Sequence, residues 1–562
     1  VIAPVATSTP AVPPVQPITP AKPLDLGKPV ETGTLGAIDA ESTGLFSPAE
    51  GGLGSTLWKG TSRAVVEKVL PHMGLPTQSA VLNNLAQRLL LTIASVPEGP
   101  AGTNPNLTSM RLERLLALGD VTNAWKYAAS LKSGQVDETT LRLLSENALL
   151  TSEGDAICAK LPATMQTYKG SEWQKLLAVC QLRAKDAKAS QLTLDLLRTQ
   201  GVKDETFFYL AEKNINGTAK QLPRQLTPLK PLTLALLRIV DQPLPGEVYV
   251  RPDAALVPEL LKIKSRDEMA RLSLAERMAE RGLMSAADLS AVYKTVVFAP
   301  EAFNGVASSA EKGPRLHALL YQAALQDKTA QGRINNALLF LSSSSGSLIS
   351  GVGAQILVDM LGDVKPAPEF NAASGGIAHI YTLAGKADVA QEWLRQAKQA
   401  SIGMPPIKLE LQMIWPLTVL AGLVPDAQYK DELNKWIDTA LQPVDGKDER
   451  ATREQIGSVL MLLDAAGFSV PDLAWAKIID APVFDKKVVP SAFYYDRLRA
   501  AAQGNRRGET VLFTLALTGK EDAPLLTDVE VVRSLRAVGL TTDAIALARE
   551  AVTVLMTPPV KL

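Results

Sequence analysis

The sequence predicts an all-α protein, an irregular α-solenoid of helical hairpins with an extended proline-rich arm at its N-terminus. Three observations lead to this prediction. Alanine and leucine are abundant, and aromatic residues make up only 5% of the 562 residues, which is typical of packed amphipathic helices. From residue 57 onward, apolar residues recur at helical spacing between turns that contain glycine. Residues 1–29 hold eight prolines and show no apolar period.

The first 56 residues form the predicted arm. The stretch 1–29 favours polyproline II geometry and cannot bury a core of its own. Residues 30–56 continue with many glycines and little hydrophobic pattern. We therefore predict a Pro/Gly-rich extended arm or tether at 1–56. Two interpretations of this arm stay open, a tail without a partner and a spacer that leads to a membrane anchor or signal sequence.

The helical body is predicted to begin near Leu57. Thr61 and Ser62 offer an N-cap for the stretch RAVVEKVL, because their short polar side chains can accept hydrogen bonds from the first free backbone N–H groups. A longer amphipathic helix is predicted at 78–94, where leucine, valine and isoleucine recur at helical spacing. From residue 107 onward, short helices are expected to alternate with tight turns.

At several points of the chain, glycine closes one predicted helix and a polar residue opens the next. Gly119, Gly385 and Gly539 mark such steps. Glycine suits the left-handed conformation in which many helices end, and the small residues that follow it allow close packing. The spacing between steps is irregular. The sequence therefore predicts a degenerate tetratricopeptide-like superhelix rather than an array with a fixed period of about 34 residues.

The two cysteines mark the clearest hairpin. Cys158 lies in GDAICAKLPATM, Cys180 lies in SEWQKLLAVCQLRA, and position 169 midway between them falls in a turn-like stretch. Residues at equal distances from the turn of an antiparallel hairpin lie level with each other, so we predict a disulfide between these cysteines. Two buried reduced thiols are the alternative. A disulfide favours an oxidising compartment such as the bacterial periplasm.

The second helix of this hairpin has its own signals. Ser171 and Gln174 have the spacing of a capping box at its start. Trp173 and Cys180 lie seven positions apart, with leucines between them at helical spacing. We therefore predict that the indole and the thiol share one buried face.

Stretches rich in proline, glycine and polar residues divide the helical body. They lie at 214–231, 241–254, 362–376 and 442–450. We predict an N-terminal helical-hairpin lobe at 57–240 and a C-terminal helical-repeat lobe at 241–562 that continues the first. Two separate lobes are the alternative.

Charge and hydropathy restrict the classes of partner. Lysine plus arginine equals aspartate plus glutamate at 58 each, so no net field attracts nucleic acid, and we expect no nucleic-acid partner. No apolar run reaches the roughly 18 residues that cross a bilayer. The sequence begins with Val1, and we expect that a targeting segment or anchor preceded it. Contact with a membrane is expected only through such an anchor.

No catalytic motif is complete. Lytic transglycosylases combine a catalytic glutamate with a GLMQ-like segment and an aromatic-Asn-Ala-Gly motif, and residues 282–285 read GLMS. The other elements are missing, so we interpret Glu268 and Glu280 as solvated helix charges. The sequence also lacks a Gly-x-Ser-x-Gly elbow. It predicts no enzyme, no catalytic residue, no cofactor and no metal ligand, while a triad assembled from distant residues stays open.

Three further features are interpreted as structural. His72, His317 and His379 are isolated in the sequence and form no metal-ligand pair. The run at 342–355, SSSSGSLISGVGAQ, lacks the lysine of a phosphate-binding loop, and we predict a flexible loop or a helix crossing at small residues. The basic turn at 504–508 is either solvated or a contact for an acidic partner.

One combination of residues resembles a known group of proteins. Cys158, Trp173-Gln174 and Cys180-Gln181, followed by the leucine-rich stretch 192–197, resemble a pattern in alphaproteobacterial exported helical-repeat proteins. A fainter similarity is to periplasmic proteins that support the flagellar motor. The resemblance implies a scaffold around a stator or ring, with assembly into an oligomer or ring.

Together these observations predict a non-enzymatic periplasmic α-solenoid scaffold or adaptor. We expect it to bind other envelope proteins through its solenoid surface and its N-terminal arm. The resemblance implies a structural component of a flagellar motor or a similar envelope machine. The alternative function is that of a peptidoglycan-acting enzyme or its helical regulatory domain.

Overall fold

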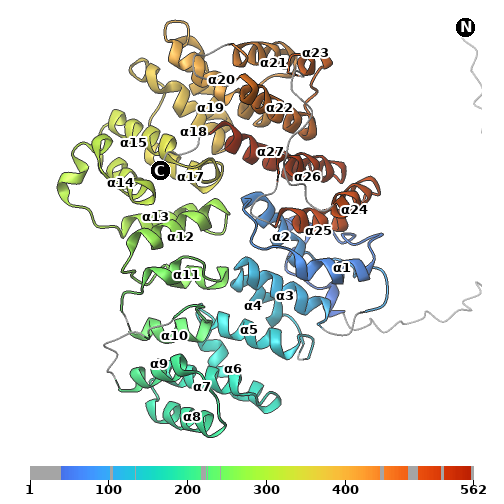
Figure 1. Ribbon diagram of the computed structural model, residues 1–562, viewed down its shortest axis with the longest axis vertical. Helices are drawn as coiled ribbons and strands as arrows, with labels where there is room; N and C mark the ends of the chain where they lie inside the picture. Colours follow the sequence, from blue (N-terminus) through green and yellow to red (C-terminus); the bar gives the residue numbers. More distant parts are fainter. Residues whose placement is uncertain are drawn as a thin grey trace, which may run out of the picture. The chain divides into compact units, whose positions relative to one another are not determined.

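The computed structural model describes residues 39–101, 105–132, 134–216, 223, 226–240, 242–442, 449–478, 492–519 and 524–557. Within these residues all regular elements are helices, and 27 α-helices follow one another along the chain (Figure 1). The predicted all-α, solenoid-like class is confirmed. Residues 1–38 of the predicted arm lie outside the described residues.

The helices have the following bounds. Those of the first half are α1 (Arg63–Val69), α2 (Ala80–Leu91), α3 (Leu107–Leu118), α4 (Val121–Ala129), α5 (Glu138–Ala148), α6 (Gly154–Thr167), α7 (Ser171–Arg183), α8 (Ala187–Thr199), α9 (Glu205–Asn216), α10 (Pro231–Val240), α11 (Val257–Leu260), α12 (Glu268–Glu280) and α13 (Ala286–Lys294). Those of the second half are α14 (Gly313–Gln326), α15 (Ala330–Ser343), α16 (Gly346–Ile349), α17 (Val352–Leu361), α18 (Ser374–Leu383), α19 (Ala387–Ala400), α20 (Pro405–Leu420), α21 (Asp426–Ala440), α22 (Glu449–Ala466), α23 (Asp472–Ala476), α24 (Ala492–Gln503), α25 (Arg507–Thr518), α26 (Leu525–Ala537) and α27 (Thr541–Met556). Short 3-10 helices occur between them at Ala40–Ser42, Pro48–Glu50, Leu70–His72, Gly246–Tyr249, Ala254–Leu256, Pro300–Phe303, Val306–Ser308 and Pro368–Ala373.

Successive helices pack against each other as hairpins. The pairs α7–α8, α14–α15, α18–α19, α24–α25 and α26–α27 show this arrangement along the whole chain. Each helix buries one apolar stripe against its neighbour, because a short amphipathic helix gains most of its stability from such packing. The predicted division at about residue 240 stays a prediction, and residues 40–562 group into one unit.

The predicted glycine turns are confirmed. Gly119, Gly385 and Gly539 have φ values of 90°, 68° and 79°, in the left-handed region that side chains with a Cβ rarely adopt. After Gly119, the side chain of Asp120 accepts a hydrogen bond from the backbone N–H of Asn123 (3.2 Å) and so caps α4. Glycine therefore ends the first helix of each step, as predicted. The predicted polar cap forms after Gly119 but not in the other two steps, because the N-caps Lys386 and Leu540 make no side-chain cap hydrogen bond.

Some predicted helix starts are wrong in detail. The capping box at Ser171 does not form, because α7 already includes this residue and its N-cap is Gly170. The carbonyl of Gly170 accepts from the backbone N–H of Trp173 (3.1 Å), which places the first turn of the helix one residue earlier. The helix predicted at 78–94 is shorter. It begins after the N-cap Ser79, whose side chain accepts from the N–H of Leu82 (3.1 Å).

Residues 40–56, which the sequence assigns to the end of the arm, pack on the helical body. The backbone N–H of Leu45 donates to the carbonyl of Leu91 at the end of α2 (2.8 Å). From α3, the buried guanidinium of Arg111 donates to the carbonyl of Thr43 (2.8 Å), and burial lowers the pKa of Arg111. The body of the protein therefore begins before residue 57.

The last helix joins segments that are far apart in the sequence. Helix α27 packs against α2, α16, α20, α22 and α26, and α2 also packs against α25 (Figure 1). The approach of α16 to α27 depends on a small residue, because a Cβ added at Gly346 would lie 2.8 Å from the Cα of Val554. The helix crossing predicted within 342–355 is therefore confirmed. Helix α2 from the start of the body and the last helix α27 thus meet in addition to the packing of neighbours that a solenoid requires.

Candidate functional site

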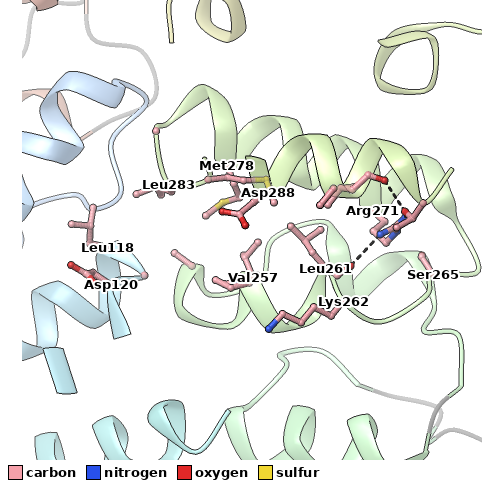
Figure 2. A pocket seen from close by; sticks show the side chains of 18 of the residues that line it. Leu118, Asp120, Val257, Leu261, Lys262, Ser265, Arg271, Met278, Leu283 and Asp288 are labelled. Carbon is pink, nitrogen blue, oxygen red and sulfur yellow. Dashed lines mark hydrogen bonds between the residues drawn. The ribbon is translucent and has the colours of Figure 1, made fainter. Parts of the chain in front are cut away.

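A groove of about 900 Å³ lies between α11, the α12–α13 hairpin and the neighbouring parts of α2 and the α3–α4 turn (Figure 2). One wall comes from α11 and the residues that follow it, and the facing wall comes from α12 and α13. Most of the lining is apolar, and Val257, Leu261, Met278 and Leu283 are among its apolar residues. The groove is a concave, largely apolar surface, which is the usual form of a binding site.

The guanidinium of Arg271 fixes the two walls to each other. Its Nη1 donates to the carbonyl of Leu261 beside α11 (3.1 Å), and its Nη2 donates to Oγ1 of Thr295 after α13 (2.6 Å), as Figure 2 shows. Arg271 is only 7% exposed, and within the described part of the chain it has no ion pair. Its guanidinium therefore lies largely buried at this end of the groove and donates to neutral oxygen atoms.

The other end of the groove is closed by α2 and the α3–α4 turn. The side-chain amide of Gln87 donates to Asp120 (2.6 Å), and that of Asn83 donates to the carbonyl of Arg281 at the end of α12 (2.9 Å). Gly282 permits this contact, because its φ is 67° and a Cβ there would lie 2.8 Å from the Cβ of Ala80. Asp120 thus lies at the end opposite Arg271 (Figure 2).

Charges of both signs stand along the rim. Lys262 pairs with Glu259 (2.5 Å), whereas the ammonium of Lys264 has no partner among the described residues. On the facing wall, Asp288 accepts a hydrogen bond from Ser285 (2.6 Å). An apolar floor with a charged rim has the chemistry of a site that binds a peptide segment.

The glutamates singled out in the sequence make side-chain contacts. Glu268 forms an ion pair with Arg315. Glu280 accepts a hydrogen bond from Oγ of Ser345 (2.6 Å), and burial raises its pKa. The interpretation of Glu280 as a solvated charge is therefore wrong, because the serine run before α16 folds back onto α12.

The structure assembles a Ser-His-Glu arrangement that the sequence did not reveal. Nδ1 of His317 lies 2.8 Å from Oε1 of Glu276, and Oγ of Ser344 lies 3.5 Å from Nε2 of His317. This order of groups resembles a hydrolytic triad. Ser344, however, is only 1% exposed and donates to the carbonyl of Phe340 (2.7 Å). We therefore assign this cluster to the packing of α12, α14 and α15. No local motif could reveal it, since its members lie far apart in the sequence.

The other two histidines have different surroundings. His72 is exposed at the end of a 3-10 helix. Burial lowers the pKa of His379 to about 4, so this imidazole is neutral at neutral pH. In the described part of the chain, no three histidine, cysteine, aspartate or glutamate side chains are grouped as a metal site would need. The same residues contain no helix that is long and apolar enough to cross a membrane.

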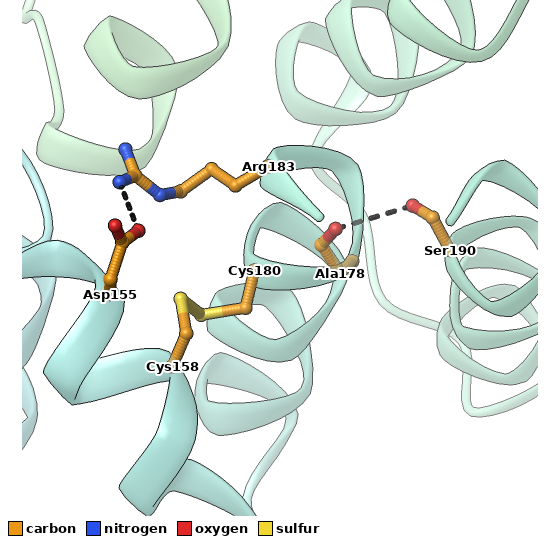
Figure 3. Close-up of a disulfide and its surroundings, with 6 residues drawn as sticks. All are labelled: Asp155, Cys158, Ala178, Cys180, Arg183 and Ser190. Atoms are coloured by element: carbon orange, nitrogen blue, oxygen red, sulfur yellow. Dashed lines mark hydrogen bonds and ion pairs between the residues drawn. A yellow bond between two sulfur atoms is a disulfide. The ribbon is translucent and has the colours of Figure 1, made fainter. Parts of the chain in front are cut away.

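Cys158 and Cys180 meet as the sequence predicted. Their sulfur atoms lie 2.04 Å apart, which is disulfide distance, and join α6 to α7 (Figure 3). Asp155 and Arg183 form an ion pair beside them (2.7 Å). Trp173 lies on the predicted buried face and is 1% exposed. The cysteine pair therefore acts as a structural cross-link between two packed helices.

The basic turn at 504–508 contacts the protein itself. Nη1 of Arg507 donates to the carbonyl of Leu53 (3.1 Å), and the backbone N–H of Gly508 donates to the carbonyl of Leu57 (2.9 Å). Gly508 is buried and Arg507 is partly buried, so simple solvation of the whole turn is wrong, whereas contact with an acidic partner stays a prediction. The segment that contains Leu53 and Leu57 therefore packs against the start of α25.

Comparisons with protein-family models, curated proteins and solved structures find no match to this chain. The resemblance to exported helical-repeat proteins stays a prediction. The functional assignment therefore depends on the geometry of the groove and on the cysteine pair.

Proposed function

We propose that this protein is a non-enzymatic α-helical scaffold of the periplasm that binds another envelope protein in the groove between α11 and the α12–α13 hairpin. The observation that carries the proposal is the groove itself. Its volume of about 900 Å³ accommodates several side chains of a partner segment. Its apolar floor and charged rim match the apolar centre and polar border of protein interfaces.

The charges of the groove restrict the partner segment. Arg271 lies at one end, and Asp120 lies at the other (Figure 2). A bound segment is therefore expected to carry an acidic group near Arg271 and Lys264, apolar side chains over Val257 and Leu261, and a basic group toward Asp120. Complementary charges of this kind select partners and orient them.

The cysteine pair supports the compartment, and the resemblance predicted from the sequence suggests the kind of partner. The cysteine pair at disulfide distance favours an oxidising compartment. The resemblance to exported helical-repeat proteins and to flagellar-motor proteins favours a partner in a flagellar motor or a similar envelope machine. The proposal therefore includes the periplasm as the compartment and a component of such an envelope machine as the partner.

Photocrosslinking in a bacterial envelope extract tests this function. Benzoylphenylalanine replaces Ala291, an exposed residue of the groove wall, or, as a control, Leu192, which is 73% exposed on α8. We expect one envelope protein to crosslink from position 291 and not from position 192. In the same chain, Leu283→Arg should abolish the crosslink, because it places a charge on the apolar floor.

Two results would contradict the proposal. Equal crosslinking from both positions would show that the groove selects no partner. Release of muropeptides from purified peptidoglycan by the protein would favour the enzymatic alternative instead. Thermal unfolding of each variant, followed by circular dichroism, controls for loss of folding.

A further inference from the structure

A second surface, separate from the groove, lies at the start of α20. Ile402 and Met404 in the preceding turn are 89% and 39% exposed, and Leu409 and Met413 on the helix are 57% and 38% exposed. Pro405 at the first helical position is also exposed. Leu409 and Met413 lie four positions apart and therefore on one face of α20, and exposed apolar residues that share a face favour an interaction surface over the scattered single residues that are ordinary. Methionine suits such a surface, because its flexible thioether adapts to a partner.

A cavity of about 400 Å³ opens beside this apolar group, between α19, α20 and α21. Trp415 and Trp436 form part of its wall and stack with ring centroids 5.4 Å apart. Both indole N–H groups have partners, since Trp415 donates to Glu432 (2.9 Å) and Trp436 donates to the carbonyl of Gln412 (2.9 Å). The aromatic wall therefore has no unsatisfied N–H group and suits an apolar side chain.

The charges that line this cavity are mainly positive. Lys398, Lys408 and Lys435 line it, with Glu432 as the acidic residue of the lining. Glu432 accepts from Trp415 and also lies 3.5 Å from the ammonium of Lys398. Within the described part of the chain, the ammonium groups of Lys408 and Lys435 have no partner. Two positive charges are therefore available to a ligand, unlike the mixed charges of the groove at α11.

The apolar group and the cavity are neighbours on one helix. Lys408 and Gln412 face the cavity, and Leu409 and Met413 follow them by one residue. One residue corresponds to about 100° around an α-helix. A single bound segment can therefore cover the apolar group and also reach the two lysines.

We propose that the start of α20 and the adjoining cavity form a docking site for an acidic amphipathic helix of a partner protein. The apolar face of that helix covers Leu409 and Met413, one apolar side chain enters the cavity beside Trp415 and Trp436, and its carboxylates pair with the free lysines. A partner helix fits better than a membrane surface, because a cavity walled by three helices takes one side chain and is closed to a flat bilayer. The proposal adds a second binding site and does not depend on the groove at α11.

Fluorescence anisotropy with a designed peptide tests this site. The probe is a labelled helix of about 18 residues, long enough to form in water, with leucines along one face and glutamates beside them. In its control, lysine replaces every glutamate. We expect the acidic peptide to bind the full chain about tenfold more tightly than the basic one.

Variants assign the binding to this site. Lys408→Glu combined with Lys435→Glu should weaken binding of the acidic peptide about tenfold, and Leu409→Ser combined with Met413→Ser should weaken binding of both peptides. Leu192→Ser on α8 is the matched control, because it removes another exposed leucine, one that does not line the cavity. It should leave binding unchanged.

Three outcomes would overturn the proposal. The first is equal affinity for the acidic and basic peptides, or affinity that the α20 variants do not change. The second is binding of phosphatidylglycerol vesicles that the lysine variants abolish, which would assign the surface to an anionic membrane. The third is a dimer that Leu409→Ser dissociates, which would assign the surface to a second copy of this chain.

Discussion

Two regions of the protein are held together in different ways. One is the hairpin α6–α7, whose two helices are joined by a disulfide. The other is the junction of α2 with α25 and α27, which is held by non-covalent contacts. In the hairpin, Cys158 and Cys180 lie 22 residues apart and their sulfur atoms are at bonding distance. In the junction, Arg88 pairs with Asp543 (2.6 Å) across a separation of 455 residues, and no covalent link joins the described helices. A short loop costs little entropy to close, whereas a junction between distant helices forms only when the segments between them are folded.

The two regions also respond to different conditions. The junction contains Glu550, which accepts a hydrogen bond from the backbone N–H of Val81 at the start of α2 (3.3 Å). Burial raises the pKa of Glu550 to about 7, and burial together with the charge of Glu550 raises the pKa of Asp528 to about 7. The hairpin is therefore expected to respond to reducing agents, and the junction to pH.

Removal of the disulfide is expected to have the largest effect and to remain local. Cys158→Ser combined with Cys180→Ser should lower the free energy of unfolding of the hairpin by about 3 kcal/mol, because the bond restricts the unfolded chain. Hydrogen exchange should accelerate in α6 and α7 and stay unchanged in α2. Equal acceleration in α2 would show that the two regions unfold as one unit.

A bulkier residue at Gly508 of α25, where the segment before α1 packs on that helix beside the junction, is expected to have the next largest effect. In Gly508→Ala, the new Cβ would lie 2.6 Å from Cε3 of Trp58 and 2.7 Å from the carbonyl oxygen of Leu57. We expect the free energy of unfolding to fall by about 2 kcal/mol in urea denaturation.

A glycine of the hairpin provides the matched control for this substitution. Gly170 has a φ of −64°, and the nearest atom to a Cβ there is 4.0 Å away. Gly170→Ala should therefore cost less than about 1 kcal/mol. Similar losses in the two variants would contradict the difference in packing between the regions.

The pH response of the junction is expected to be about as large as the effect of Gly508→Ala. The folded state keeps the proton of Glu550 up to about pH 7, while the unfolded chain loses it near the ordinary pKa of 4.5. The free energy of unfolding should therefore fall as the pH rises from about 4.5 to about 7, and it should not change further above that range. The free energies of unfolding from urea denaturation at pH 5 and pH 8 should differ by on the order of 2 kcal/mol.

Two variants assign this pH response to the junction. Glu550→Gln should reduce the difference between pH 5 and pH 8, because the amide does not titrate. The chain with Cys158→Ser and Cys180→Ser should keep the full difference. A pH response that Glu550→Gln leaves intact would place its origin elsewhere in the protein.

The features that the sequence predicted correctly are local ones. The glycine turn at Gly119 and the meeting of Cys158 with Cys180 follow from residues within one hairpin, and so does the burial of Trp173. The groove at α11 was not predicted, although residues 282–284 in its lining belong to a segment that was tested as part of a catalytic motif. Its walls come from four separate segments of the chain, and no spacing in the sequence connects them.

By itself, the sequence determined that the chain is helical, where several helices end and which faces of the clearest helices are apolar. These properties depend on backbone conformation and on periods of a few residues, which neighbouring side chains control. Only the tertiary structure decided that Ser344 meets His317, that Arg507 contacts Leu53 and that α27 packs against α2. The physical reason is that the hydrophobic effect has no direction. An apolar stripe requires burial, and the shape of the whole chain decides which surface buries it.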